Sequence, residues 1–544
     1  MKKLFIILSI ISIGIFYHTL THRGSVFSFT PLASNSALTV VPLDSRPPCR
    51  DFTAQLGQLA GYDIKLPPNE IMDNKETPAQ TKALQGWLNN SLTHSQGAII
   101  STDILAFGGL LQNRLGPLEP TQKQELLAYL TTLRQRNAAK PLYVYSVIPR
   151  LLVSDHILPD RWYQWHLMQW SVSMDKKLQK LPYDVTQYKE LQAEIPLALK
   201  VKYTQLYWQN ALWNRELIKL AQENDFTHLT IGQDDAMEFG LPNHNRLDVQ
   251  ETFGKLKTPA TYKVTQGADE IGTLAVATLF LEQHKHRPKI FLAYSTPKTK
   301  QMLLHFVPLT LEQIAKDKIN MLQGELVTTP EQADFVLFIH CGDDNGESYA
   351  DAAAKVKSYM QKAPLALVDL SMNFMAGESL LPALMAAGAP LPQLLSYSGW
   401  NTASNAIGSA VAQGAIVSLQ SRLLPPEQLP TLYAQNFKFN CARFLDDWAY
   451  QREIRYKVKE FEELNGINAN ATAPHTALVA NYIARELGLY KSLLLYTNLN
   501  RHPFYTDGKA AYYLDDLDYQ VQLPWARPFE IDLKVTPRFR VREM

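Results

Sequence analysis

The chain has 544 residues, of which 46% are hydrophobic and 19% are charged, and its formal net charge is +1 at pH 7. This composition is typical of a globular protein with one large domain or with two or three smaller ones. A net charge near zero provides no electrostatic attraction for nucleic acid or for an anionic membrane surface, so the composition argues against a nucleic-acid partner.

The N-terminal segment predicts export. Lys2 and Lys3 precede an apolar run over residues 4–16, the order found in secretory signals, and this run is short for a transmembrane helix. Small residues over 34–37 suit cleavage, whereas the absence of a sharp cleavage site after the apolar run suits an uncleaved anchor. We expect residues 1–37 to be an export signal or membrane tether with a linker, and the protein to be periplasmic or extracellular.

Residues 38–422 alternate between short apolar runs and helix-like segments. Strand-length runs cover 38–44, 98–103, 141–150, 228–235, 290–295, 334–340, 365–371 and 394–401. Helical spacing of apolar residues occurs over 51–60, 77–92, 121–136, 268–282, 297–319, 349–361, 379–387 and 404–421. Nearly continuous apolar strands indicate burial on both faces, as in parallel sheets covered by helices.

Eight such units with polar residues at the strand ends predict an α/β fold, an eightfold β/α (TIM-like) barrel. The alternative is a pair of tandem open doubly wound sheets. The long gap over about 151–225 predicts a helical insertion after the third strand of the barrel domain, 38–422. Prolines near residue 425 mark a change of pattern, and 423–544 predicts a C-terminal α+β appendage, helical with a small β part.

Asp234 and Asp235, at the end of the fourth run, form the strongest local signal for catalysis. Two adjacent carboxylates cannot both ionise freely, so one is held as an acid while the other stays charged, which is what acid–base chemistry on a glycosidic bond needs. The alternative is a pair of solvated loop residues.

Four charged residues near the ends of the first three runs are predicted substrate-binding residues. Arg46 either binds a substrate carboxylate or phosphate or neutralises Asp44, which we also place at the site. Asp103 is either an acceptor for sugar hydroxyls or a helix N-cap. Arg150 is either a substrate contact or part of a structural salt bridge.

The later runs add four predicted substrate-binding residues. Asp369 and Asn373 are expected to hold a hydroxyl or an amide, or to form loop hydrogen bonds only. Trp400 is a sugar platform and Asn401 a donor to a carbonyl oxygen, unless they are a packed ring and a helix N-cap. No metal or cofactor is predicted.

Five segments resemble the bacterial family catalogued as domain of unknown function 4127. They are 41–47, 101–110, 233–236, 267–270 and 399–405, and the resemblance extends to the segments 523–525 and 529–530. This resemblance implies no established activity.

The predicted barrel is also similar, more distantly, to glycoside hydrolase family 84, whose members remove N-acetylglucosamine with substrate assistance. Asp234 and Asp235 match that family's Asp-Asp pair in type and strand number, and Asp103 and Asp369 with Asn373 fall at strand ends where it has polar sugar contacts. The loop around Asp343, the long insertion and the appended segment depart from that family.

This second resemblance implies an exported glycoside hydrolase acting on a 2-acetamido sugar, β-N-acetylhexosaminidase-like and retaining. The acetamido carbonyl would attack the anomeric carbon, Asp234 would accept the acetamido N–H, and Asp235 would protonate the leaving oxygen. Two alternatives remain open. One is a metal-dependent hydrolase or deacetylase using Asp44, Asp103, His340 and Asp343; the other is a non-catalytic glycan-binding protein.

Overall fold

The computed structural model describes residues 25–34, 36–75, 77–116, 118–153, 158, 160–342, 348–373, 375–399 and 401–544. The predicted export signal lies outside these residues and stays a prediction. Within the described ranges, no helix combines the length and apolar character needed to cross a membrane.

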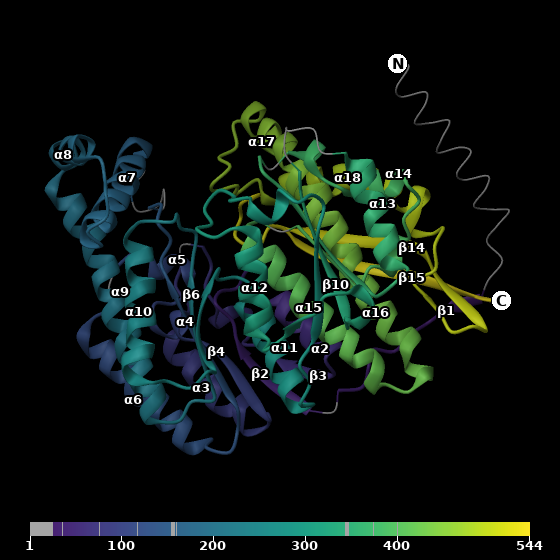
Figure 1. Ribbon diagram of the computed structural model, residues 1–544, viewed down its shortest axis with the longest axis horizontal. Helices are drawn as coiled ribbons and strands as arrows, with labels where there is room; N and C mark the ends of the chain where they lie inside the picture. Colours follow the sequence, from purple (N-terminus) through teal and green to yellow (C-terminus); the bar gives the residue numbers. More distant parts are fainter. Residues whose placement is uncertain are drawn as a thin grey trace.

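The chain is an α/β protein in which two open parallel sheets lie side by side (Figure 1). The first sheet has the order β3-β2-β4-β5-β6-β7. Its strands are β2 (Ser36–Val41), β3 (Tyr62–Lys65), β4 (Gly97–Ser101), β5 (Leu142–Ile148), β6 (His228–Gln233) and β7 (Tyr262–Gln266). Its helices are α2 (Asp51–Leu59), α3 (Thr81–Thr93), α4 (Thr102–Ala106), α5 (Leu110–Asn113), α6 (Pro120–Arg136), α10 (Leu241–Leu256) and α11 (Ile271–Gln283).

The second sheet has the order β12-β11-β10-β8-β9. Its strands are β8 (Lys289–Tyr294), β9 (Glu325–Leu326), β10 (Phe335–Gly342), β11 (Leu365–Ser371) and β12 (Ser396–Ser398). Its helices are α12 (Leu311–Met321), α13 (Tyr349–Met360), α14 (Leu381–Ala386) and α15 (Ala403–Leu423). In both sheets the first strand lies inside the order with later strands on either side, which is the arrangement of doubly wound folds.

The predicted barrel is therefore wrong, although all eight apolar runs contain strands. A barrel would pair the fourth predicted strand with the fifth, but β6 pairs instead with β7, which the apolar pattern did not indicate. The unpredicted strands β3 and β9 likewise end their sheets beside β2 and β8. In the described part of the chain, each sheet thus has two unpaired edges and does not close on itself. Local periodicity did not predict this, because strand pairing depends on contacts between segments that are distant in the sequence.

The space between the sheets is filled by α11 and α15. Residues 271–281 of α11 are all buried, and the core that contains them includes side chains of both sheets. Gly414 of α15 lies so close to β10 that an added Cβ would stand 2.8 Å from the ring of Phe335. The helix α15 therefore packs directly against the second sheet.

Two further parts complete the fold. Three helices, α7 (Arg161–Leu178), α8 (Val185–Glu194) and α9 (Leu197–Glu223), lie between β5 and β6, where the helical insertion was expected; α7 and α8 project from the body of the molecule (Figure 1). The C-terminal part contains α16 (Leu429–Arg443), a π-helical segment (Phe444–Ile454), α17 (Arg455–Leu464), α18 (Thr476–Leu494) and a second π segment (Leu495–Leu499). Its antiparallel sheet consists of β1 (Ser25–Phe27), β13 (Tyr505–Thr506), β14 (Ala510–Gln522) and β15 (Asp532–Glu543).

Candidate functional site

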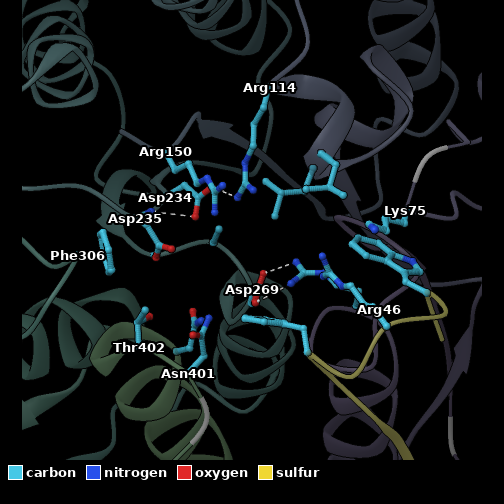
Figure 2. Close-up of a pocket in the computed structure, with 18 of the residues that line it drawn as sticks. Arg46, Lys75, Arg114, Arg150, Asp234, Asp235, Asp269, Phe306, Asn401 and Thr402 are labelled. Carbon is cyan, nitrogen blue, oxygen red and sulfur yellow. Dashed lines mark hydrogen bonds and ion pairs between the residues drawn. The ribbon is translucent and has the colours of Figure 1, made fainter. Parts of the chain in front are cut away.

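A cavity of about 440 Å³ lies where the carboxyl ends of the two sheets meet the C-terminal part (Figure 2). In open α/β sheets, ligands bind outside the carboxyl ends of the strands, near the point where the strand order reverses. Segments that follow β2, β4, β5, β6, β7, β8 and β12 contribute to this wall. The polar lining residues are Arg46, Lys75, Arg114, Arg150, Asp234, Asp235, Gln266, Asp269, Asn401, Thr402, Asn405, Asn468, Asn470 and Arg527, and the aromatic ones are Phe306, Trp525 and Phe529.

The turn after β6 places Asp234 and Asp235 in the wall of this cavity. The Asp234 N–H donates to the carbonyl of Ile148 at 3.2 Å, and the Leu151 N–H donates to the carbonyl of Asp235 at 2.8 Å. These two bonds tie the turn to the end of β5. The backbone of the pair is therefore anchored at the end of β5, and both side chains line the cavity.

Asp234 is a buried carboxylate held in its charged form. Arg114 donates to one of its oxygens, and the Asp235 N–H donates to the other at 2.9 Å. Burial opposes ionisation, but Arg114, the Asp235 N–H and Arg150 outweigh it and hold the pKa of the Asp234 carboxyl below its usual range. Asp234 is therefore a fixed negative charge in the wall.

Asp235 has the opposite character. Burial, followed by the charge of Asp234, raises the pKa of Asp235 to about 7, although Arg150 and Arg114 act against the rise. Its carboxyl oxygens have no hydrogen-bond partner in the described part of the chain, and the group points into the cavity on the side of Thr402 and Asn401 (Figure 2). A carboxyl group that is accessible and half-protonated near neutral pH is suited to donate and accept protons.

Arg46 links Asp44 to a third cavity carboxylate, Asp269. Its guanidinium donates to Asp44 at 2.7 and 2.9 Å and to Asp269 at 2.7 Å, and it lies 5.2 Å from the ring centre of Trp525. Asp44 is fully buried behind Arg46 and does not line the cavity. Both readings of Arg46 thus have support in its position, since it neutralises Asp44 and also lines the cavity.

The turn after β7 brings Asp269 to Arg46. Gly267 has φ +103°, and a Cβ there would stand 2.0 Å from a carboxyl oxygen of Glu270. Glycine is therefore favoured at this position by both the backbone conformation and the lack of space for a side chain. Glu270 in turn pairs with the fully buried Lys318 of α12 at 2.7 Å. The buried ion pair therefore supports the segment that carries Asp269.

The structure gathers some predicted site residues at the cavity and leaves others elsewhere. Asp234, Asp235, Arg46, Arg150 and Asn401 line it, whereas Trp400 lies outside the described residues.

Besides Asp44, three predicted substrate-binding residues do not line the cavity. Asp103 is buried and accepts from Asn113 at 2.7 Å and from the Val147 N–H at 3.0 Å, which is a structural role rather than an N-cap. Asp369 accepts from Ser379 and from the Tyr397 hydroxyl inside the second sheet, and Asn373 bonds Glu378. The polar groups of these residues are used within the protein.

Sequence reasoning missed several cavity residues. Asp269 lies in 267–270 and Trp525 in 523–525, segments that carry the family resemblance, so a signal for both was present. Arg114 and Lys75 lie in none of the segments that carry the resemblance and had no comparable signal. Arg114 is 120 positions from the carboxylate it binds.

The three described residues of the metal hypothesis do not come together. Asp44 is paired with Arg46, Asp103 is bonded to Asn113, and His340 lies in β10 of the other sheet with its Nε2 3.1 Å from the carbonyl of Glu378. Asp343 lies outside the described residues. Among the residues that are described, no three His, Cys, Asp or Glu side chains are grouped so as to hold a metal ion.

The raised pKa of Asp235 predicts a pH-dependent contribution to stability. Because the folded protein binds this proton more tightly than the unfolded chain, the contribution is present below the unfolded pKa, about 3.9, and is lost as the pH rises through about 7. We expect the free energy of unfolding of the wild type, relative to that of Asp235→Asn, to fall over this interval and to level off above it. Urea unfolding of both proteins at several pH values measures this difference, and a constant difference would contradict the pKa assignment.

The comparisons with known proteins place the chain in a family. The family model described as "Protein of unknown function (DUF4127)" matches residues 38–534. No match was found among curated proteins or among solved structures. The chain belongs to the DUF4127 family.

Proposed function

We propose that this DUF4127 protein is a glycoside hydrolase in which Asp235 is the general acid–base residue. The observation that carries the proposal is the position of Asp235, which faces the cavity with a pKa of about 7 beside the ionised Asp234. Glycosidic bond cleavage needs one carboxyl group that delivers a proton and one negative charge that stabilises the positively charged sugar in the transition state.

The remaining wall supports a sugar as the ligand. Amide and guanidinium groups from Gln266, Asn401, Asn405, Asn468 and Asn470 and from the arginines supply donors and acceptors suited to hydroxyl groups. Aromatic side chains, Trp525 and Phe529 among them, supply surfaces on which the apolar face of a sugar ring packs. Several convergent polar groups with a few aromatic rings are typical of small-molecule sites.

In the proposed reaction, Asp235 in its protonated form donates to the glycosidic oxygen as the bond to the anomeric carbon breaks. Asp234 stabilises the charge that develops on the sugar, because Arg114 and the Asp235 N–H keep it ionised and fix its orientation. Asp235 then takes a proton from the attacking water. On a 2-acetamido sugar, the substrate's acetamido oxygen attacks the anomeric carbon first and no protein nucleophile is needed.

The finer assignment to a β-N-acetylhexosaminidase-like activity is part of the same proposal, but one of the arguments for it no longer holds. Its analogy to glycoside hydrolase family 84 used the strand order of a barrel, whereas Asp234 and Asp235 follow the fifth strand of an open sheet. The acetamido group must therefore be tested directly. An exported location also stays a prediction, from residues 2–16.

We expect the purified protein to hydrolyse chromogenic 2-acetamido-2-deoxy glycosides and to leave their 2-hydroxy counterparts intact, because only the former carry the internal nucleophile. Release of the chromophore from paired substrates measures this. Hydrolysis of 2-hydroxy glycosides at an equal rate would support a glycosidase but contradict a substrate-assisted mechanism. Saturable sugar binding without turnover would instead favour the non-catalytic glycan-binding alternative.

A further inference from the structure

A second pocket, of about 280 Å³, adjoins the polar cavity at the base of the helical insertion. Arg114 and Arg150 line both spaces, so these two side chains form a shared wall. The other walls of the second pocket come from α9, from Leu167 of α7, and from residues that follow β5 and α5. The two spaces therefore adjoin at these two arginine side chains.

The second pocket is mainly apolar. Seven of its lining residues are leucine or valine, among them Val153, Leu167 and Leu199. Two tyrosines, Tyr203 and Tyr207, also line the pocket. The hydroxyl of Tyr203 donates to the carbonyl of Leu151 at 2.7 Å, and the hydroxyl of Tyr207 donates to the carbonyl of Arg150 at 2.6 Å. Their polar atoms are thus satisfied by the backbone, and the rings offer a surface for an apolar ligand.

The wall between the two spaces contains an unsatisfied donor. Arg114 has a side chain only 9% exposed, and one of its terminal nitrogens binds Asp234. Its Nε is buried and has no hydrogen-bond partner among the described residues. A buried donor without a partner costs free energy, and a ligand oxygen that reached this nitrogen after a small shift of the side chain would recover that free energy.

We propose that the substrate is an amphiphile, with a hydroxyl-rich head in the polar cavity and an apolar alkyl or acyl tail in the second pocket. An ester, amide, carboxylate or phosphate oxygen at the junction of head and tail accepts from Arg114. The assignment of the head rests on the proposed function; that of the tail rests on the pocket itself. The small volume favours a chain over a peptide helix, whose diameter with side chains is about 10–12 Å.

The tail is tested with a probe that needs no turnover, 11-(dansylamino)undecanoic acid, whose carboxylate imitates the junction oxygen. We expect saturable binding at one site, with an increase in dansyl fluorescence. Burial of one methylene contributes roughly 0.8 kcal/mol, or about fourfold in affinity, so a variant that excludes several methylenes should bind at least about tenfold more weakly. Leu199→Trp places a large ring in the pocket and should have this effect.

The matched control is Leu197→Trp, the same substitution on the same helix at a position that is 70% exposed and does not line the pocket. It should bind the probe as the wild type does. Val153→Phe narrows the pocket from its other wall and replaces Leu199→Trp if that variant fails to fold, as judged by circular dichroism. Absence of saturable binding, or equal binding by the pocket variants and the control, would overturn the proposal.

The outcomes separate this inference from the proposed hydrolase activity. Turnover of a simple glycoside without probe binding would overturn the proposed tail site and leave the proposed hydrolase activity supported. Pocket-dependent probe binding without turnover of any glycoside would support the proposed tail site and contradict the assignment of a glycoside as the head group.

Discussion

Replacing Asp235 with Asn is expected to lower turnover by about 10²- to 10⁴-fold, the usual contribution of a positioned acid–base group. Asn has nearly the same shape but cannot deliver a proton, so the fold should be retained. In the wild type, turnover should decrease above about pH 7, because deprotonation of Asp235 removes the acid. Initial rates across the pH range, with circular dichroism of both proteins, measure these effects.

The control for this experiment is Glu238→Gln, which changes an exposed carboxyl group three positions along the chain that does not line the cavity. Its turnover and pH profile should match those of the wild type. An Asp235→Asn variant with near-normal turnover would rule out the acid–base assignment, and one with an unchanged decrease above pH 7 would assign that decrease to another group.

Replacing Lys318 with Met is expected to destabilise the protein by about 3–5 kcal/mol, the range found when one partner of a buried ion pair is removed. Both Lys318 and Glu270 are almost completely buried, and Lys318 also donates to the hydroxyl of Thr265 at 2.7 Å. The variant leaves the Glu270 carboxylate in the core without its partner. The shift of the urea unfolding midpoint, followed by circular dichroism, measures the loss.

Two further variants show whether the unpaired charge causes the loss. Lys316→Met removes an exposed lysine of the same helix, whose ion pair with Glu312 spans one helical turn, and should change stability by less than about 0.5 kcal/mol. Combining Lys318→Met with Glu270→Gln removes the buried charge and should recover part of the loss. Equal midpoints for Lys318→Met and Lys316→Met would contradict the role of the buried pair.

The apolar pattern located eight strands but left out β3, β7 and β9. These strands are short or polar: β7 alternates Tyr262-Lys263-Val264-Thr265-Gln266, and both residues of β9 are exposed. An edge strand needs few apolar side chains, because it is covered less completely than a central strand. The missing edge strands are the elements that distinguish two open sheets from one closed barrel.

The carboxylate pair illustrates the same division between local and distant information. An apolar strand followed by Asp234 and Asp235 is a local pattern, and it was sufficient to predict two carboxyl groups at the end of a strand. Which of them keeps its proton depends on Arg114, whereas the third cavity carboxylate, Asp269, is joined to Arg46 across 223 positions. Charges so far apart in the sequence meet only through packing.

By itself the sequence determined the α/β class, most strands and helices, and the strand end that carries Asp234 and Asp235, because burial on both faces and helical periodicity are recorded in neighbouring residues. Tertiary structure alone decided that the strands form two open sheets, that Trp525 lines the cavity, and that Arg114 and Arg150 lie between the polar cavity and the apolar pocket. Those outcomes depend on which hydrogen-bonding edges, charges and apolar surfaces meet when distant segments pack, and no local pattern records that choice.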